Sequence, residues 1–147
     1  MNRTDVIKGI LFAVALFESR KIYAGDYKNV NTQGIKRLAN REDPTISEQK
    51  HVPAIEVPGK VNPGEWFDVN VKVGFLKEHP SSHEHWITMI KLLIDGKDIA
   101  STNFKVGGKS APNATFRVKL EKSSTLEAIE HCNLHGTWIS DKINVKV

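Results

Sequence analysis

The chain has 147 residues, of which 39% are hydrophobic and 26% are charged, and its formal net charge is +4. This length and composition predict one globular domain with an extension, and the scattered lysines and arginines argue against nucleic-acid binding. The single cysteine excludes an intrachain disulfide and any site that needs four cysteines from one chain.

An apolar run at residues 10–17 is too short to span a bilayer. One interpretation is a retained amphipathic helix that begins near Thr4, because hydrophobic residues recur there at helical spacing. The alternative is a signal peptide ending near Ala24, although the charged stretch 18–21 is unusual for a signal. We favour the helix and expect a cytoplasmic protein without stable membrane insertion, with export as the alternative if residues 1–24 act as a signal peptide.

A polar connector follows the predicted helix. Asn31-Thr32 could begin a short helix that runs through Leu38 and ends before Pro44. We therefore divide the chain into an N-terminal extension, residues 1–47, made of a helix and a connector, and a domain covering residues 48–147.

From His51 onward the hydrophobic pattern becomes that of short strands. Val69, Val71 and Val73 alternate with polar residues, and Asp95-Gly96 provides a tight turn between two apolar segments. The expected strands occupy residues 51–57, 69–73, 87–94, 99–104, 116–120, 126–132 and 143–147. Their number and spacing predict an all-β fold, a seven-stranded immunoglobulin-like β-sandwich with a helical N-terminal extension.

Histidines and the single cysteine form the most informative pattern. Cys132 and His135 are three residues apart, so a thiolate and an imidazole could bind the same metal ion. On its own this pair is weak, because a lone cysteine is commonly a small buried residue. His79 precedes a proline, which favours an extended or turned loop, and His85 follows six residues later. Such ligands suit iron, copper or zinc better than calcium or magnesium.

Three motifs in this order resemble the superoxide reductase family, which includes neelaredoxins and the iron-binding domain of desulfoferrodoxins. The motifs are Lys50-His51-Val52-Pro53, His79-Pro80 with a second histidine six residues on, and Cys132-Asn133-x-His135-Gly136-x-Trp138. The resemblance covers about residues 48–147 and implies a mononuclear non-haem iron that cycles between Fe2+ and Fe3+. It implies an open sixth position, an axial thiolate from Cys132, and four equatorial histidines: His51, His79, His85 and His135. His83 and His131 fall outside the pattern, and we expect them to be solvated or structural.

The activity implied by the resemblance is the one-electron reduction of superoxide to hydrogen peroxide. Lys50 is the implied catalytic residue, which would attract superoxide and help to protonate the product. Because the chain lacks a four-cysteine iron domain, the electrons would come from an external donor such as rubredoxin. The family also implies a homo-oligomer, a dimer or a tetramer.

One position departs from the family pattern. Family members commonly have a glutamate directly before the lysine, whereas this chain has Gln49 there and Glu48 one residue earlier. On an extended strand a shift of one residue turns the side chain to the opposite face, so Glu48 is a poor substitute. We expect a ferric iron that is five-coordinate or binds water or hydroxide.

Other interpretations of the same residues remain open. One is a non-catalytic immunoglobulin-like metal-binding or electron-transfer module. Another is an immunoglobulin-like binding module of the sulfur-carrier or adhesion type, in which the histidines are incidental. A structural zinc site usually has four ligands, and a copper site of the blue type uses two histidines, so both fit five matched positions poorly. A Cys–His nucleophile would leave three matched histidines unexplained. Trp86 and Trp138 could screen the imidazoles, and the amides of Leu134 and His135 could donate to the sulfur.

Overall fold

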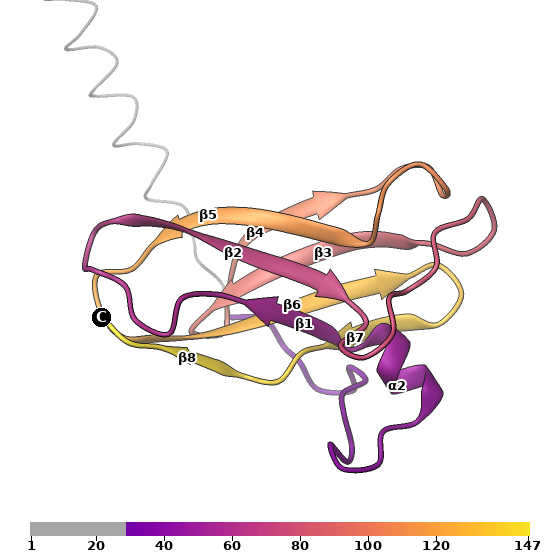
Figure 1. The fold of residues 1–147 in the computed structure, drawn as a ribbon, viewed down its shortest axis with the longest axis horizontal. Helices are drawn as coiled ribbons and strands as arrows, with labels where there is room; N and C mark the ends of the chain where they lie inside the picture. The colour runs from indigo at the N-terminus through magenta and orange to yellow at the C-terminus, as the bar shows by residue number, and fades with distance from the viewer. Residues whose placement is uncertain (1–28) are drawn as a thin grey trace, which may run out of the picture.

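The computed structural model describes residues 29–147, so the helix predicted near the N-terminus lies outside the described residues. The described chain forms two antiparallel sheets packed face to face, which confirms the predicted all-β sandwich (Figure 1). The smaller sheet has the strand order β1-β2-β5, with bounds β1 Pro53–Glu56, β2 Trp66–Val73 and β5 Asn113–Lys119. The larger has the order β4-β3-β6-β7, with β8 also paired to β6; its bounds are β3 Ile87–Ile94, β4 Lys97–Asn103, β6 Ser124–Cys132, β7 Gly136–Ile139 and β8 Ile143–Val145.

The structure therefore has eight strands among the described residues, where the sequence predicted seven. The additional strand is β7, which has only four residues and pairs with the end of β6, Cys132 opposite Gly136. The turn between these two strands carries the Cys-x-x-His spacing, so the motif occupies the end of a hairpin.

Alternating side chains from both sheets fill the core. In β2, Val69, Val71 and Val73 are almost fully buried, whereas the residues between them are exposed, as the period-two pattern predicts. Each such valine stabilises the fold by roughly 1.5–3 kcal/mol through burial of its apolar surface. Cys132 belongs to the same core cluster and is 0% exposed, so its sulfur lies beneath the end of the sandwich.

A short helix, α2 (Ile46–His51), lies where the sequence predicted the end of the connector and the start of the first strand. Thr45 and Glu48 form a capping box, in which each side chain binds the other's backbone N–H, and this fixes the start of the helix. The chain becomes extended only at Pro53. The prediction of a strand from His51 is therefore wrong at its start, because the capping box outweighs the local strand pattern. Within residues 29–147, no helix is long and apolar enough to cross a membrane.

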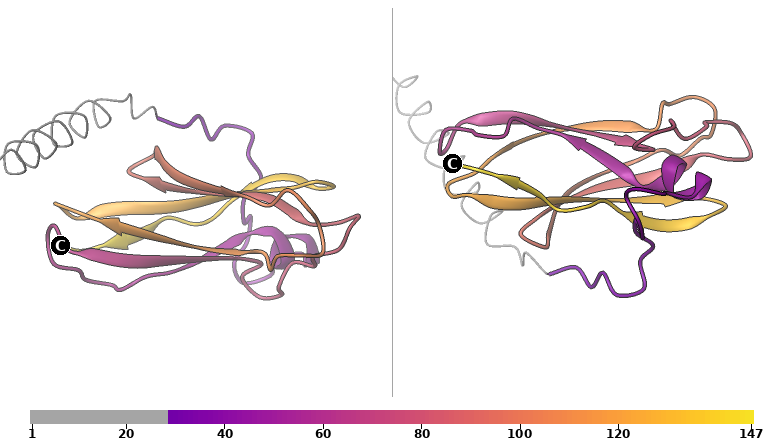
Figure 2. Two further views of the ribbon diagram at one scale, coloured as in Figure 1. Left: turned by 90° about the horizontal axis from the view of Figure 1, so that it is seen from above. Right: turned by 60° about the horizontal axis from the view of Figure 1, so that its bottom comes forward.

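The connector covers the outer face of the larger sheet. Val30 and Ile35 pack against a small buried cluster of Leu93, Ile129 and Ile139. The helix predicted through Ile35 and Leu38 is absent: residues 31–40 contain a turn and an isolated bridge. The views of Figure 2 show this indigo segment leading to α2. The contact with the sheet requires an extended chain, so tertiary packing overrides the weak helical pattern.

Candidate metal centre

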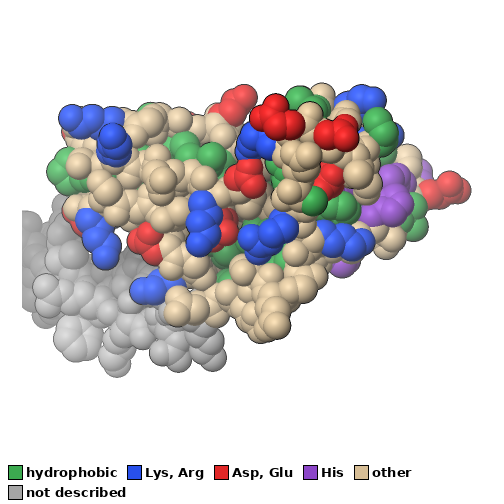
Figure 3. All heavy atoms as spheres, turned by 90° about the horizontal axis from the view of Figure 1, so that it is seen from below, with side chains coloured by type: hydrophobic (Ala, Val, Ile, Leu, Met, Phe, Trp, Pro, Cys, Tyr) green, Lys and Arg blue, Asp and Glu red, His purple; other side chains and the backbone are tan. Residues whose placement is uncertain are grey.

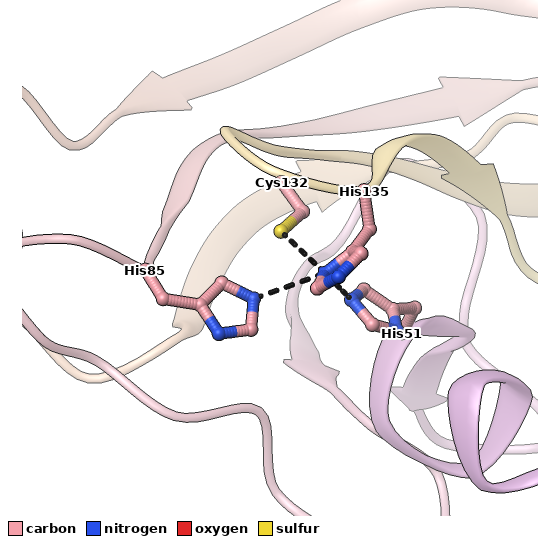
Figure 4. Close-up of side chains that lie close together, drawn as sticks. All are labelled: His51, His85, Cys132 and His135. Atoms are coloured by element: carbon pink, nitrogen blue, oxygen red, sulfur yellow. Dashed lines mark hydrogen bonds between the residues drawn. The ribbon is translucent and has the colours of Figure 1, made fainter.

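Five of the predicted site residues lie together at one end of the sandwich, where Figure 3 shows histidine side chains gathered at the surface. They come from α2, from the loop between β2 and β3, and from the β6–β7 turn. Four donor atoms lie within 4.8 Å of one another, one each from His51, His85, Cys132 and His135 (Figure 4). His79 lies beside these residues, with its ring centroid 4.5 Å from that of His85.

The four imidazoles stand at the corners of a distorted square. Going around it, neighbouring ring centroids are 4.8 Å apart for His51–His79, 4.5 Å for His79–His85, 4.8 Å for His85–His135 and 4.9 Å for His135–His51. Neighbouring rings are nearly perpendicular, at 70–80°, and the His51–His85 diagonal is longer, at 6.3 Å. This arrangement suits four equatorial nitrogen ligands around one ion.

In His51 and His79, a hydrogen bond made by one ring nitrogen determines which nitrogen faces the centre. Nδ1 of His51 lies 2.7 Å from the Ser47 carbonyl oxygen, and Nδ1 of His79 lies 2.7 Å from the Pro80 carbonyl oxygen. Carbonyl oxygens only accept, so each Nδ1 carries the proton and each Nε2 keeps its lone pair. The buried Nε2 of His79 has no hydrogen-bond partner among residues 29–147, which a bound metal would explain.

His135 presents its Nδ1 to the centre. This atom is 3.1 Å from Nε2 of His51, 3.2 Å from Nε2 of His85 and 3.6 Å from Sγ of Cys132. A single nitrogen cannot donate to all three, so these atoms converge as metal ligands do. The set of four imidazoles and one thiolate fits the mononuclear iron that the sequence resemblance implies.

Electrostatics keep the rings in the form that binds metal. Burial lowers the pKa of His51 and of His85, and it lowers the pKa of His79 to about 4. The neighbouring imidazoles act in the same direction. These three rings are therefore mainly neutral at neutral pH, with lone pairs available to a cation.

The sulfur lies in a different environment. Burial raises the pKa of the Cys132 thiol, whereas the backbone N–H groups of Leu134 and His135 act to lower it. Glu130 is fully buried on the same face of β6, and neither of its carboxyl oxygens has a hydrogen-bond partner in the described part of the chain. Burial raises the pKa of Glu130 to about 9, so it is a neutral acid at neutral pH. Our sequence reasoning missed Glu130; the signal available was its spacing of two from Cys132 on a strand.

Lys50 occupies the last turn of α2, is half-buried, and directly precedes His51. Its ammonium group is close enough to the cluster to contribute, after burial and His135, to the lowered pKa of His85. A cation at this place raises the local concentration of a small anion.

Neither residue considered as a substitute for the family glutamate faces the centre. Gln49 donates its side-chain amide to the Pro44 carbonyl oxygen at 2.9 Å. The Glu48 carboxylate is buried and accepts from the backbone N–H of Ala39 at 2.8 Å and of Thr45 at 2.7 Å. The prediction that Glu48 lies on an extended strand is wrong, because the residue belongs to α2 and its carboxylate caps the start of that helix.

Asn133 joins the two loops that carry ligands. Its Oδ1 accepts from the Trp86 N–H at 2.9 Å, its Nδ2 donates to the Glu84 carbonyl oxygen at 2.8 Å, and its own N–H donates to the Trp86 carbonyl oxygen at 3.2 Å. These bonds fix the turn that follows Cys132 against the segment that carries His85. This linking role of Asn133 was not predicted from the sequence.

The remaining candidates fall around the cluster. Trp138 stacks on the His51 ring, with centroids 5.1 Å apart and an interplanar angle of 16°, so it screens that ring from water. Trp86 donates its indole N–H to the Phe104 carbonyl oxygen. His83 is exposed and outside the cluster, and His131 binds Thr137 Oγ1 at 2.8 Å through its Nδ1.

Comparison with known proteins agrees with this site. The family model for desulfoferrodoxin matches residues 43–141. Neelaredoxin from Megalodesulfovibrio gigas is 32% identical over an alignment of 111 residues, which covers 64% of this chain and 85% of that protein. Superoxide reductase from Pyrococcus furiosus is 34% identical over an alignment of 107 residues, which covers 61% of this chain and 84% of that protein.

Solved structures give the same relation. The superoxide reductase (neelaredoxin) of Ignicoccus hospitalis superposes with a TM-score of 0.66 at 36% identity and covers 77% of this chain and 94% of that one. The reduced form of the Archaeoglobus fulgidus protein of the same name gives a TM-score of 0.61 at 28% identity, covering 77% and 98%. With the sequence match, the sandwich and the His/Cys cluster in agreement, the chain belongs to the desulfoferrodoxin family of superoxide reductases and neelaredoxins.

Proposed function

We propose that this protein reduces superoxide to hydrogen peroxide at one iron ion per chain. The iron would be held by four imidazoles and one thiolate, those of His51, His79, His85, His135 and Cys132. Each superoxide takes up one electron from an external donor and two protons from the protein and solvent, and it leaves as one hydrogen peroxide. Bound iron would supply the one-electron chemistry by alternating between Fe2+ and Fe3+.

The observation that carries this proposal is the square of four imidazoles with a buried sulfur beside it. Five protein donors leave room for one further ligand, as catalytic metal sites do. Cys132 lies on the core side, whereas His135 is exposed and His85 is half-buried. The open position therefore belongs on the side that solvent and a small anion can reach.

The chain's own residues give this position its preference for an anion. With neutral imidazoles and one thiolate as ligands, a ferrous centre keeps a net charge of about +1, which favours superoxide. Lys50 adds a second positive charge on the residue next to His51, and its ammonium group can hold a proton near the product. Because Gln49 and Glu48 are both engaged elsewhere, we propose water or hydroxide, or no sixth ligand, in the ferric state.

The electron donor, the assembly and the location complete the proposal. We propose a small external redox protein such as rubredoxin as the donor, since the described residues contain one candidate metal-binding cluster and the chain has one cysteine. We also propose a homo-oligomer, a dimer or a tetramer, in the cytoplasm.

A pulse of superoxide applied to the reduced, iron-loaded protein tests the activity. We expect superoxide to disappear in a bimolecular reaction that oxidises one iron per chain and forms one hydrogen peroxide per superoxide, without release of dioxygen. The Cys132→Ser variant is the matched control, because it replaces only the sulfur. Decay of superoxide at its unassisted rate in the fully loaded wild type would contradict the proposal and favour a non-catalytic metal-binding module.

A further inference from the structure

Lys36 lies before the region that the family model matches, yet the structure fixes it against the metal centre. Its backbone N–H donates to the Thr137 carbonyl oxygen at 3.2 Å, and its carbonyl oxygen accepts from Ile139 at 2.9 Å. It therefore forms a parallel bridge alongside Trp138 of β7. The main chain at Lys36 is held by the strand that follows the ligand turn.

The side chain continues toward the site. The Lys36 ammonium lies 5.3 Å from the centre of the Trp138 ring, which is within the range of a cation–π contact. It donates to the carbonyl oxygen of His135 at 2.8 Å, and the Trp138 indole N–H points at the same oxygen at 3.3 Å. Two donors thus hold the backbone of the one ligand that presents Nδ1 to the centre.

The positive charge of Lys36 also reaches other ligands. It helps to lower the pKa of His51, after burial and the charges of His135 and His85. At Cys132 it acts to lower the pKa of the thiol, which burial raises. The Trp138 ring lies close to both this lysine and His51, and it stacks on the imidazole. Lys36 is therefore connected to the donor set by a hydrogen bond, an aromatic ring and its electrostatic field.

We infer that Lys36 is a positioning residue for the iron site, which fixes the His135 turn and raises the reduction potential of the bound metal. This inference rests on the proposed iron centre. A nearby positive charge stabilises the ferrous state relative to the ferric state, because the ferric ion carries one more positive charge. Lys36 is exposed, so added salt weakens this effect.

Redox titration of the iron-loaded full chain, followed by its visible absorption, tests the inference. Lys36→Met keeps an apolar side chain over Trp138 but removes the positive charge and the hydrogen-bond donor. Lys36→Arg keeps the charge and the donor. We expect the Met variant to bind iron and to have a lower midpoint potential. At a fixed solution potential its ferrous-to-ferric ratio should fall about threefold or more at low salt. The shift should shrink at high salt, and the Arg variant should restore the wild-type potential.

Lys119→Met is the matched control, because the Lys119 ammonium lies 5.2 Å from the Trp66 ring at the start of β2, far along the strand from the site. It changes the net charge equally and should leave the potential unchanged. An unchanged potential in Lys36→Met, or an equal shift in the Lys119 variant, would overturn the inference. Failure of the proposed function would give a different result. In that case neither the wild type nor any variant would react with superoxide, whatever their midpoint potentials.

Discussion

Glu130 allows a quantitative test of how burial acts beside the metal centre. Its side chain is 0% exposed and has no hydrogen-bond partner among the residues that the structure describes, and burial raises its pKa from 4.5 to about 9. The folded protein without metal therefore keeps Glu130 protonated at neutral pH. The unfolded chain ionises it above about pH 4.5.

The sign of the effect follows from proton uptake. Between these two pKa values the folded state binds more protons than the unfolded state, so stability falls as pH rises. One pKa unit corresponds to about 1.4 kcal/mol, so the free energy of unfolding should fall by about 2 kcal/mol between about pH 6.5 and about pH 8. His79, with its pKa lowered from 6.5 to about 4, acts in the opposite direction, but its contribution is complete above its unfolded pKa.

Urea unfolding of the metal-free protein over this pH range is the appropriate assay. The Glu130→Gln variant keeps the size of the side chain but cannot ionise, so its free energy of unfolding should stay nearly constant while that of the wild type falls. Glu127→Gln is the matched control: Glu127 is 6% exposed on the opposite face of β6, and this variant should follow the wild-type curve. Parallel curves for the wild type and Glu130→Gln would refute the reasoning.

Two further substitutions test the site, and a third tests the backbone directly after β2. Lys50→Ala should slow the bimolecular reaction with superoxide about tenfold at low salt and weaken its salt dependence with iron still bound, whereas an unchanged rate would remove the role of this lysine. Asn133→Ala should lower iron affinity about tenfold in competition with a chelator, because two side-chain hydrogen bonds between the ligand loops are lost. Unchanged affinity would show that these hydrogen bonds are not needed to position the loops. Gly74→Ala should lower the free energy of urea unfolding by about 3 kcal/mol, because φ is 97° and a Cβ would lie 1.9 Å from the Lys77 carbonyl oxygen. Gly59→Ala, with no atom within 4 Å, is its control and should change little; equal losses would contradict the steric argument.

Much of the fold could be predicted from local patterns. The alternation of Val69, Val71 and Val73 identified β2, and the Asp95-Gly96 turn identified the β3–β4 hairpin. Both signals are local, since the alternation of a strand and the backbone conformation of a tight turn depend on residues that are close together in the sequence. β7 was missed because four residues directly after a ligand turn carry too little periodicity.

The helical regions show where local patterns fail. The capping box of Thr45 and Glu48 is a recognisable helix start, but the neighbouring apolar residues suggested a strand. The connector around Ile35 was predicted to be helical and is extended, because its apolar side chains cover the larger sheet. That choice depends on a surface built by Leu93, Ile129 and Ile139, which lie much later in the chain.

The candidate site divides in the same way. The resemblance to the superoxide reductase motifs implied which histidines and which cysteine to consider, and the structure brings all five together. The contributions of Glu130 and Lys36 were not predicted. They arise from the burial of one face of β6 and from the packing of the connector on β7, and neither arrangement follows from spacing within a motif.

Iron content, together with the visible spectrum of the oxidised protein, tests the central claim most directly. We expect one iron per chain and a thiolate-to-iron charge-transfer band that disappears in Cys132→Ser. His79→Ala should lose iron or change this band, whereas His83→Ala, which alters an exposed histidine outside the cluster, should match the wild type. A wild-type protein that takes up no stoichiometric iron, or a band that is unaffected by loss of the sulfur, would contradict the account.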